Sequence, residues 1–177
     1  MINPNSDYYK CASFYLFTCL ILIHLTILSP KVRSSELPLI TEVTPLDKKY
    51  MEGQKSVINE LAKSMGQSFS GNIDHDIQLL QRLLDSRKIT NDMTSELQAM
   101  GFILGELLAT ELGMHWVIYK DPLGRSRALR YKSSNNFLFP VTMISRRREV
   151  NNLTSVAKIY EKAFNSVAPL RDLLPFQ

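Results

Sequence analysis

The side chains that could do chemistry gather in residues 113–132. This stretch holds one of the three histidines, the only tryptophan (Trp116), and a turn with proline and glycine after Asp121. Cations dominate it and the segment that follows: Arg125, Arg127, Arg130, Lys132, Arg146, Arg147 and Arg148. Between residues 121 and 149 only Asp121 and Glu149 oppose them. Such a cluster is either a solvated face or a patch that binds an anionic partner.

We expect the chain to be an exported bacterial protein that acts as a noncatalytic binding or envelope-associated module, with a protein or an anionic ligand as the partner of this basic hairpin. Its candidate binding or structural polar cluster is Trp116, Asp121, Arg125, Arg127 and Arg147. Nucleic acid is disfavoured as a partner, because the net charge is only +4 and the N-terminal residues indicate export. A homo-oligomer is a further arrangement that the sequence leaves open.

A hydrolase-like enzyme is the alternative, with its site around His115, Asp121 and Arg127. Hydrolysis by a side-chain nucleophile needs that nucleophile, a base and a group that orients the base. The chain after residue 34 offers only His75 and His115 as bases at neutral pH, and it has no G-x-S-x-G turn. The binding interpretation is therefore favoured over the enzymatic one.

No metal and no cofactor is predicted. The triplet Asp74-His75-Asp76 combines ligand types, but neighbours on a helix point apart and make a poor chelate. The chain has no phosphate-binding glycine loop and no dinucleotide fingerprint. Cys11 and Cys19 both precede residue 34, so a chain without the first 34 residues would have no thiol.

Arg127 lies in a predicted strand, and the alternation of side chains there implies that its guanidinium needs a partner within the fold. If Leu129 and Tyr131 face the core, Arg127 lies on the same face, because side chains two residues apart share a face. A guanidinium there needs a carboxylate or backbone acceptors. Asp121 across the hairpin is the nearest candidate by sequence, and Glu106 and Glu111 are the alternatives.

Residues 1–34 are expected to be a signal peptide or an N-terminal membrane anchor. No charged residue occurs from Cys11 to Leu28, and a basic segment follows. Val32 and Ser34 are small residues that would suit cleavage after Ser34. The expected location is the periplasm or cell envelope, with the inner membrane as the alternative if the N-terminal helix stays uncleaved.

The positioning elements begin with an extended lead-in over residues 35–45. The domain over residues 46–177 is expected to be α+β, with three helices first. Thr44, Pro45 and Asp47 have the types typical of a helix start, and Asn72 or Asp74 can cap the second helix. Apolar side chains then recur at helical spacing in the first helix: Leu46, Tyr50, Val57, Leu61 and Met65.

The third helix is predicted over residues 93–112 and is apolar on more than one face, which is typical of a central helix. It stops at Gly113. Gly101 and Gly105 lie one turn apart, so another backbone is expected to approach closely there.

An antiparallel sheet of about three strands should follow. Two strands flank the Pro-x-Gly turn, and a third is predicted over residues 137–145, where Pro140 indicates an edge or a bulge. An amphipathic C-terminal helix is predicted next, capped by Asn152 or Thr154.

Four consecutive blocks resemble a family of bacterial domains, the domain of unknown function 3806. They are IQLLQRLLDSRKI, LQAMGFILGELLA, GMHWVIYKDPLGRSRALRY and FLFPVTMISRRRE, and the similarity spans about residues 50–170. The matching residues include Gly101, Gly105, Trp116, Asp121 and Arg125, together with Leu80, Gln81, Leu97, Gly124, Ala128, Leu129, Pro140, Ile144 and Arg147. The resemblance implies the extent of the domain but no activity or ligand.

Overall fold

The computed structural model describes residues 37–172, which belong to one compact unit. The prediction for residues 1–34 lies outside the described residues. Within the described part, no helix is both long and apolar enough to span a lipid bilayer. The elements follow in this order: β1 (Leu39–Glu42), α2 (Pro45–Lys63), α3 (Ile73–Asp85), α4 (Thr94–Leu112), β2 (Met114–Asp121), β3 (Gly124–Tyr131), β4 (Phe137–Leu138), η1 (Pro140–Thr142), α5 (Ser145–Glu149), α6 (Val156–Val167) and α7 (Pro169–Asp172).

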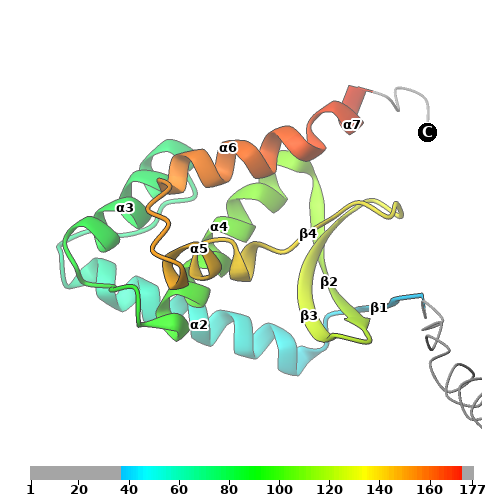
Figure 1. The fold of residues 1–177 in the computed structure, drawn as a ribbon, viewed down its shortest axis with the longest axis horizontal. Coiled ribbons are helices and arrows are strands. Elements are labelled where there is room, and N and C mark those ends of the chain that lie inside the picture. The colour runs from blue at the N-terminus through cyan, green and yellow to red at the C-terminus, as the bar shows by residue number, and fades with distance from the viewer. Residues whose placement is uncertain (1–36, 173–177) are drawn as a thin grey trace, which may run out of the picture. The chain divides into compact units, whose positions relative to one another are not determined.

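The fold is α+β, as the sequence predicted. Four strands form one antiparallel sheet in the order β1-β2-β3-β4, and most of the helices lie to one side of it (Figure 1). The residues expected to be an extended lead-in include β1, in which Ile40 pairs with Tyr119 of β2. The β2–β3 hairpin is regular from Asp121 opposite Gly124 to Met114 opposite Tyr131.

Helix ends follow the sequence closely, because caps depend on neighbouring residues. Thr44 and Asp47 form a reciprocal capping box at the start of α2, and Asn72 caps α3. Gly113 ends α4 in the left-handed conformation that glycine adopts most readily. The cap predicted for α6 is wrong: Ser155 caps the helix, while the side chain of Asn152 accepts from Thr154 in the preceding loop.

Helix α4 is the centre of the core, as its apolar faces predicted. Leu97, Leu104 and Leu108 are completely buried, and α4 packs against α2, α6 and the sheet. The buried face of α2 differs from the prediction. It consists of Asp47, Met51, Ile58 and Ala62, whereas Leu46 is 77% exposed. The buried face of α2 is therefore shifted by one residue relative to the predicted face, and Asp47 lies on the buried side.

The third predicted strand, over residues 137–145, is wrong in its length. Only Phe137 and Leu138 pair with β3, and the chain then forms η1 and α5. Figure 1 shows the chain leaving the sheet after β4 and passing to α4. Gly101 makes this approach feasible, because a Cβ there would lie 2.5 Å from the Pro140 carbonyl oxygen. The close backbone approach predicted for Gly101 is confirmed, but at Gly105 the neighbours are the side chains of Trp116 and Pro140, not another backbone.

Candidate binding cleft at the open edge of the sheet

The early end of β4 leaves part of β3 without a neighbouring strand on the side that faces away from β2. The Tyr131 N–H donates to the Asn136 carbonyl at 3.1 Å, so this peptide group points towards β4. Peptide groups two residues apart point the same way, which places those of Leu129, Arg127 and Arg125 on that side too. Leu129 meets Leu138. Arg127 would next meet Pro140, which has no N–H to donate, so pairing stops there.

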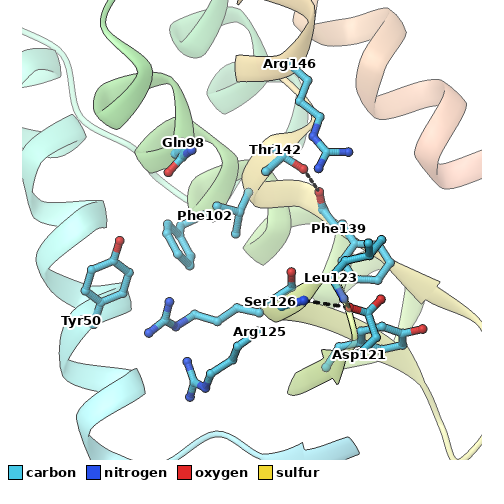
Figure 2. Close-up of a pocket in the computed structure, with 14 residues that line it drawn as sticks. Tyr50, Gln98, Phe102, Asp121, Leu123, Arg125, Ser126, Phe139, Thr142 and Arg146 are labelled. Atoms are coloured by element: carbon cyan, nitrogen blue, oxygen red, sulfur yellow. Dashed lines mark hydrogen bonds between the residues drawn. The ribbon is translucent and has the colours of Figure 1, made fainter. Parts of the chain in front are cut away.

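A cleft of about 570 Å³ lies along this open edge (Figure 2). Four consecutive residues of β3, from Gly124 to Arg127, form one wall. The opposite walls come from α2, α4, the β4–η1 segment and α5, through Tyr50, Gln98, Phe102, Phe139, Val141, Thr142 and Arg146. Tyr119, Asp121 and Leu123 complete the lining. The cleft thus occupies the space that a longer β4 would have filled.

Asp47 holds the two arginines of β3. Its Oδ1 accepts from the Nη2 atoms of Arg125 and Arg127 at 2.8 Å each, and its Oδ2 accepts from Arg125 at 2.8 Å. The carboxylate is only 3% exposed. Asp121 was predicted as the partner of Arg127, and this prediction is wrong. Asp47 reaches both arginines because the capping box fixes the first turn of α2 beside β3.

The charge state of Asp47 follows from these contacts. Hydrogen bonds from Arg125, helped by those from Thr44, hold the pKa of the Asp47 carboxyl well below its ordinary value, although burial acts in the opposite direction. Asp47 is therefore an anion at neutral pH, and it compensates one of the two guanidinium charges.

Arg127 is fixed on a second side by Tyr50. The guanidinium carbon lies 4.2 Å from the centre of the Tyr50 ring, a cation–π contact. Its Nε is buried without a hydrogen-bond partner among the described residues. Arg125 is more accessible, with 45% of its side chain exposed. Only Nη2 of each arginine is engaged by Asp47, so other N–H donors remain on each side chain.

Asp121 has a structural task in the hairpin turn. Its Oδ1 accepts from the backbone N–H groups of Leu123 and Gly124 at 2.8 and 3.0 Å. This is the local bonding by which Asp stabilises tight turns. Asp121 lines the cleft, but its hydrogen bonds are with the turn. The guanidinium groups of Arg125 and Arg127 bind Asp47 instead.

The five residues of the predicted cluster do not all meet. Asp121, Arg125 and Arg127 line the cleft, but Trp116 and Arg147 are not part of its lining. Trp116 packs into the core beside Phe102, with ring centres 5.8 Å apart. Arg147 donates to the Met143 carbonyl of its own segment.

Residues from other parts of the chain complete the site. Arg146, from the triple arginine, lines the cleft and is exposed. Asp47 and Tyr50 were not predicted as site residues. The sequence indicated only the capping role of Asp47, because its arginine partners lie 78 and 80 positions away.

The hydrolase-like site is not assembled. His115 lies opposite Arg130 at one end of the hairpin, and Asp121 lies opposite Gly124 at the other. Six residue steps along the strand separate the two by about 20 Å. His115 is exposed and does not line the cleft. The described residues contain no cluster of three or more metal-ligating side chains.

Within the Asp74-His75-Asp76 triplet, Asp76 stabilises the loop before α3. Asp76 is 1% exposed and accepts from the backbone N–H groups of Ser70 and Gly71. Burial alone would raise the pKa of Asp76, but bonds from His75, Ser70 and Gly71 lower it overall. This arrangement satisfies the carboxylate within the fold.

The family model described as domain of unknown function (DUF3806) matches residues 76–160. The resemblance to DUF3806 is therefore confirmed for these residues, which are fewer than the span of about 50–170 that the sequence indicated. The DUF3806 segment runs from α3 through the hairpin to α6, and it contributes every residue of the cleft lining except Tyr50. Asp47 also lies before it. The two residues that hold Arg127 thus come from outside the matched segment.

A crystal structure of a protein from Bacteroides thetaiotaomicron VPI-5482, at 1.50 Å resolution, has a similar fold, with a TM-score of 0.67 and 19% sequence identity. The similarity covers 77% of this chain and 50% of that one, so the matched part of this chain spans half the length of the other protein. No curated protein matches the sequence.

Proposed function

We propose that the domain is a noncatalytic binding module that takes an anionic ligand in the cleft beside β3. The observation that carries this proposal is the convergence of Arg125, Arg127 and Arg146 on one concave site. Asp47 and Asp121 are the carboxylates of the region, and both already accept hydrogen bonds from the protein. The remaining guanidinium N–H donors are therefore the ones available to a ligand.

The composition of the lining favours binding over catalysis. The described lining residues include no histidine, lysine or cysteine, and the Asp121 carboxylate among them accepts from the backbone N–H groups of Leu123 and Gly124, not from the hydroxyl groups of Ser126 or Thr142. A hydroxyl without an adjacent base is a weak nucleophile. A carboxylate or phosphate ligand, by contrast, matches the planar donors of arginine well.

Export belongs to the same proposal. The uncharged run from Cys11 to Leu28 supports delivery to the periplasm or cell envelope, either as a cleaved protein or through a retained N-terminal anchor. An exported binding module would meet its ligand outside the cytoplasm. This makes protein or small-molecule anions more suitable partners than nucleic acid.

Titration of the full chain with succinate and with inorganic phosphate tests the binding site. We expect saturable changes in the NMR signals of the Arg125 and Arg127 side chains. Arg146→Gln should weaken binding about threefold to fivefold, as expected for loss of one partly solvated charge contact. Lys162→Gln is the matched control, because Lys162 is an exposed cation on α6 outside the cleft lining. Equal weakening by both variants, or no binding of either anion, would contradict the proposal.

A further inference from the structure

The open edge of β3 offers backbone as well as side-chain partners to a ligand. Resting on the proposed function, we propose that the ligand is an extended peptide segment with an acidic–apolar–acidic pattern, which adds to β3 as a further strand. Its recognition would combine main-chain hydrogen bonds with ion pairs, a mode in which a peptide extends an existing sheet.

The main-chain hydrogen bonds that β3 can offer to a peptide follow from its register with β4. Arg125 and Arg127 direct their N–H and C=O groups to the side where β4 has ended, and both line the cleft. Among residues 37–172, no strand pairs with β3 at these positions. Unpaired edge groups of this kind are a ready template for another strand. Two residues of a peptide, one beside each arginine, can exchange hydrogen bonds with them.

The side-chain contacts of the peptide follow from the alternation of side chains along a strand. Residues directly opposite each other across a strand pair share a face, so the two peptide residues beside Arg125 and Arg127 lie next to guanidinium groups. Carboxylates suit these positions. The residue between them lies on the other face, which the cleft lines with Tyr119, Ser126 and Phe139. Tyr119 and Phe139 contact each other edge to face there, and this surface suits an apolar side chain.

A second copy of this chain is a poor occupant of the edge. Pairing β3 with another β3 would bring arginines opposite arginines, and like charges in directly opposed positions destabilise a strand pair. The outer edge of β1 gives a useful contrast, because β1 also has only one neighbouring strand. It carries Glu42 and no cation, so an acidic peptide has no charge partner there.

The probe is a five-residue peptide with blocked ends that alternates valine with glutamate and has glutamate at positions two and four. Full-length protein is mixed with it, and amide hydrogen exchange is followed by NMR. At saturation the Arg125 and Arg127 amides should exchange about tenfold more slowly. The Ser126 amide faces β2 and should not change, and neither should the amides of β1.

Two methylated peptides separate strand addition from simple charge attraction. Methylation of the glutamate amide nitrogens removes the donors that face β3 and should weaken binding about tenfold. Methylation of the central valine nitrogen removes a donor that points away and should leave affinity unchanged. Arg146→Glu should weaken binding of the parent peptide about tenfold, while Lys162→Glu leaves it unchanged.

The outcomes distinguish the two proposals. Binding of succinate and of the parent peptide without protection of the Arg125 and Arg127 amides would overturn strand addition and leave the anionic site standing. Equal affinity of the two methylated peptides would do the same. Absence of binding by succinate, by inorganic phosphate and by the peptide would overturn both proposals. Concentration-dependent protection of these amides without peptide would assign the edge to a second copy and overturn strand addition.

Discussion

Asp47 is the residue on which the geometry of the cleft depends. It closes the capping box of α2 with Thr44 and binds Arg125 and Arg127 through the same carboxylate. With the Tyr50 ring on its other side, Arg127 is held in one position. This fixed geometry would lower the entropic cost of binding the anionic ligand that we propose, because fewer flexible side chains have to be ordered.

Removing the charge of Asp47 should destabilise the protein. Asp47→Asn is expected to lower the free energy of unfolding by about 3 kcal/mol, because it leaves two partly buried guanidinium groups without their carboxylate. Urea unfolding at pH 7 measures the loss. Glu161→Gln, an exposed position on α6, serves as the control. A loss no larger than that of the control would show that the ion pairs of Asp47 with Arg125 and Arg127 are solvated and add little to stability.

The contribution of Asp47 should also depend on pH. Because its pKa is lowered on folding, the contribution is fully present above the pKa of the unfolded chain, about 4, and is lost as pH falls towards the folded-state pKa. The difference in unfolding free energy between wild type and Asp47→Asn should therefore be constant from about pH 7 to pH 5 and shrink below about pH 4. A difference that grows on acidification would contradict this sign.

The elements around the cleft are positioned by one close approach, that of the β4–η1 segment to α4. A Cβ on Gly101 would lie 2.6 Å from the Val141 Cα, and one on Gly105 would lie 2.5 Å from the Trp116 ring. The segment packs here instead of continuing along β3, where Pro140 lacks the N–H that pairing needs. The same packing that ends the strand thus opens the cleft.

Alanine at Gly101 should weaken this arrangement. We expect Gly101→Ala to lower the free energy of unfolding by about 1–3 kcal/mol, since its methyl group meets backbone atoms that have to shift. Gly53→Ala is the matched control, because Gly53 lies inside α2 with nothing within 4 Å of an added Cβ. That change should raise stability by up to about 1 kcal/mol through helix propensity. Urea unfolding of both variants measures the contrast, and a neutral Gly101→Ala would argue against close packing.

At the scale of the whole molecule, the DUF3806 segment supplies most of the cleft, and residues before it complete the site. Asp47 and Tyr50 on α2 precede the matched residues 76–160. A fragment limited to residues 76–160 would lack the carboxylate that holds Arg125 and Arg127. The functional unit we propose therefore includes α2.

Export is testable on the intact chain. We expect the protein in its native cell to be recovered from the periplasm or the membrane fraction, because the run from Cys11 to Leu28 carries no charge. Cell fractionation followed by mass spectrometry of the N-terminus measures this. A first residue of Ser35 would identify a cleaved signal peptide, and a membrane-bound chain that retains Met1 would identify an anchor. Recovery of a soluble cytosolic chain with Met1 would contradict export.

Much of the described fold was determined by the sequence itself. The caps Thr44, Asn72 and Gly113, the central helix α4 and the β2–β3 hairpin all depend on residues close together in the chain. Propensity, capping and periodicity are local properties, so they can be read without the structure. Gly101 and Gly105 also indicated a close approach, although not which segment would make it.

Only the tertiary structure decided the site. Asp47 meets arginines 78 and 80 positions away, and no local pattern links residues so distant. The apolar run over residues 137–145 has the composition of a strand. Whether it pairs with β3 or packs on α4 depends on contacts with residues that are far away in the sequence. Pro140 would lie opposite Arg127 if β4 continued, and its nitrogen has no hydrogen to donate there, whereas Gly101 on α4 leaves room for the segment, so packing on α4 is favoured. The edge of β3 stays open because the missing N–H of Pro140 and the close packing on Gly101 outweigh the local preference of this segment for a strand.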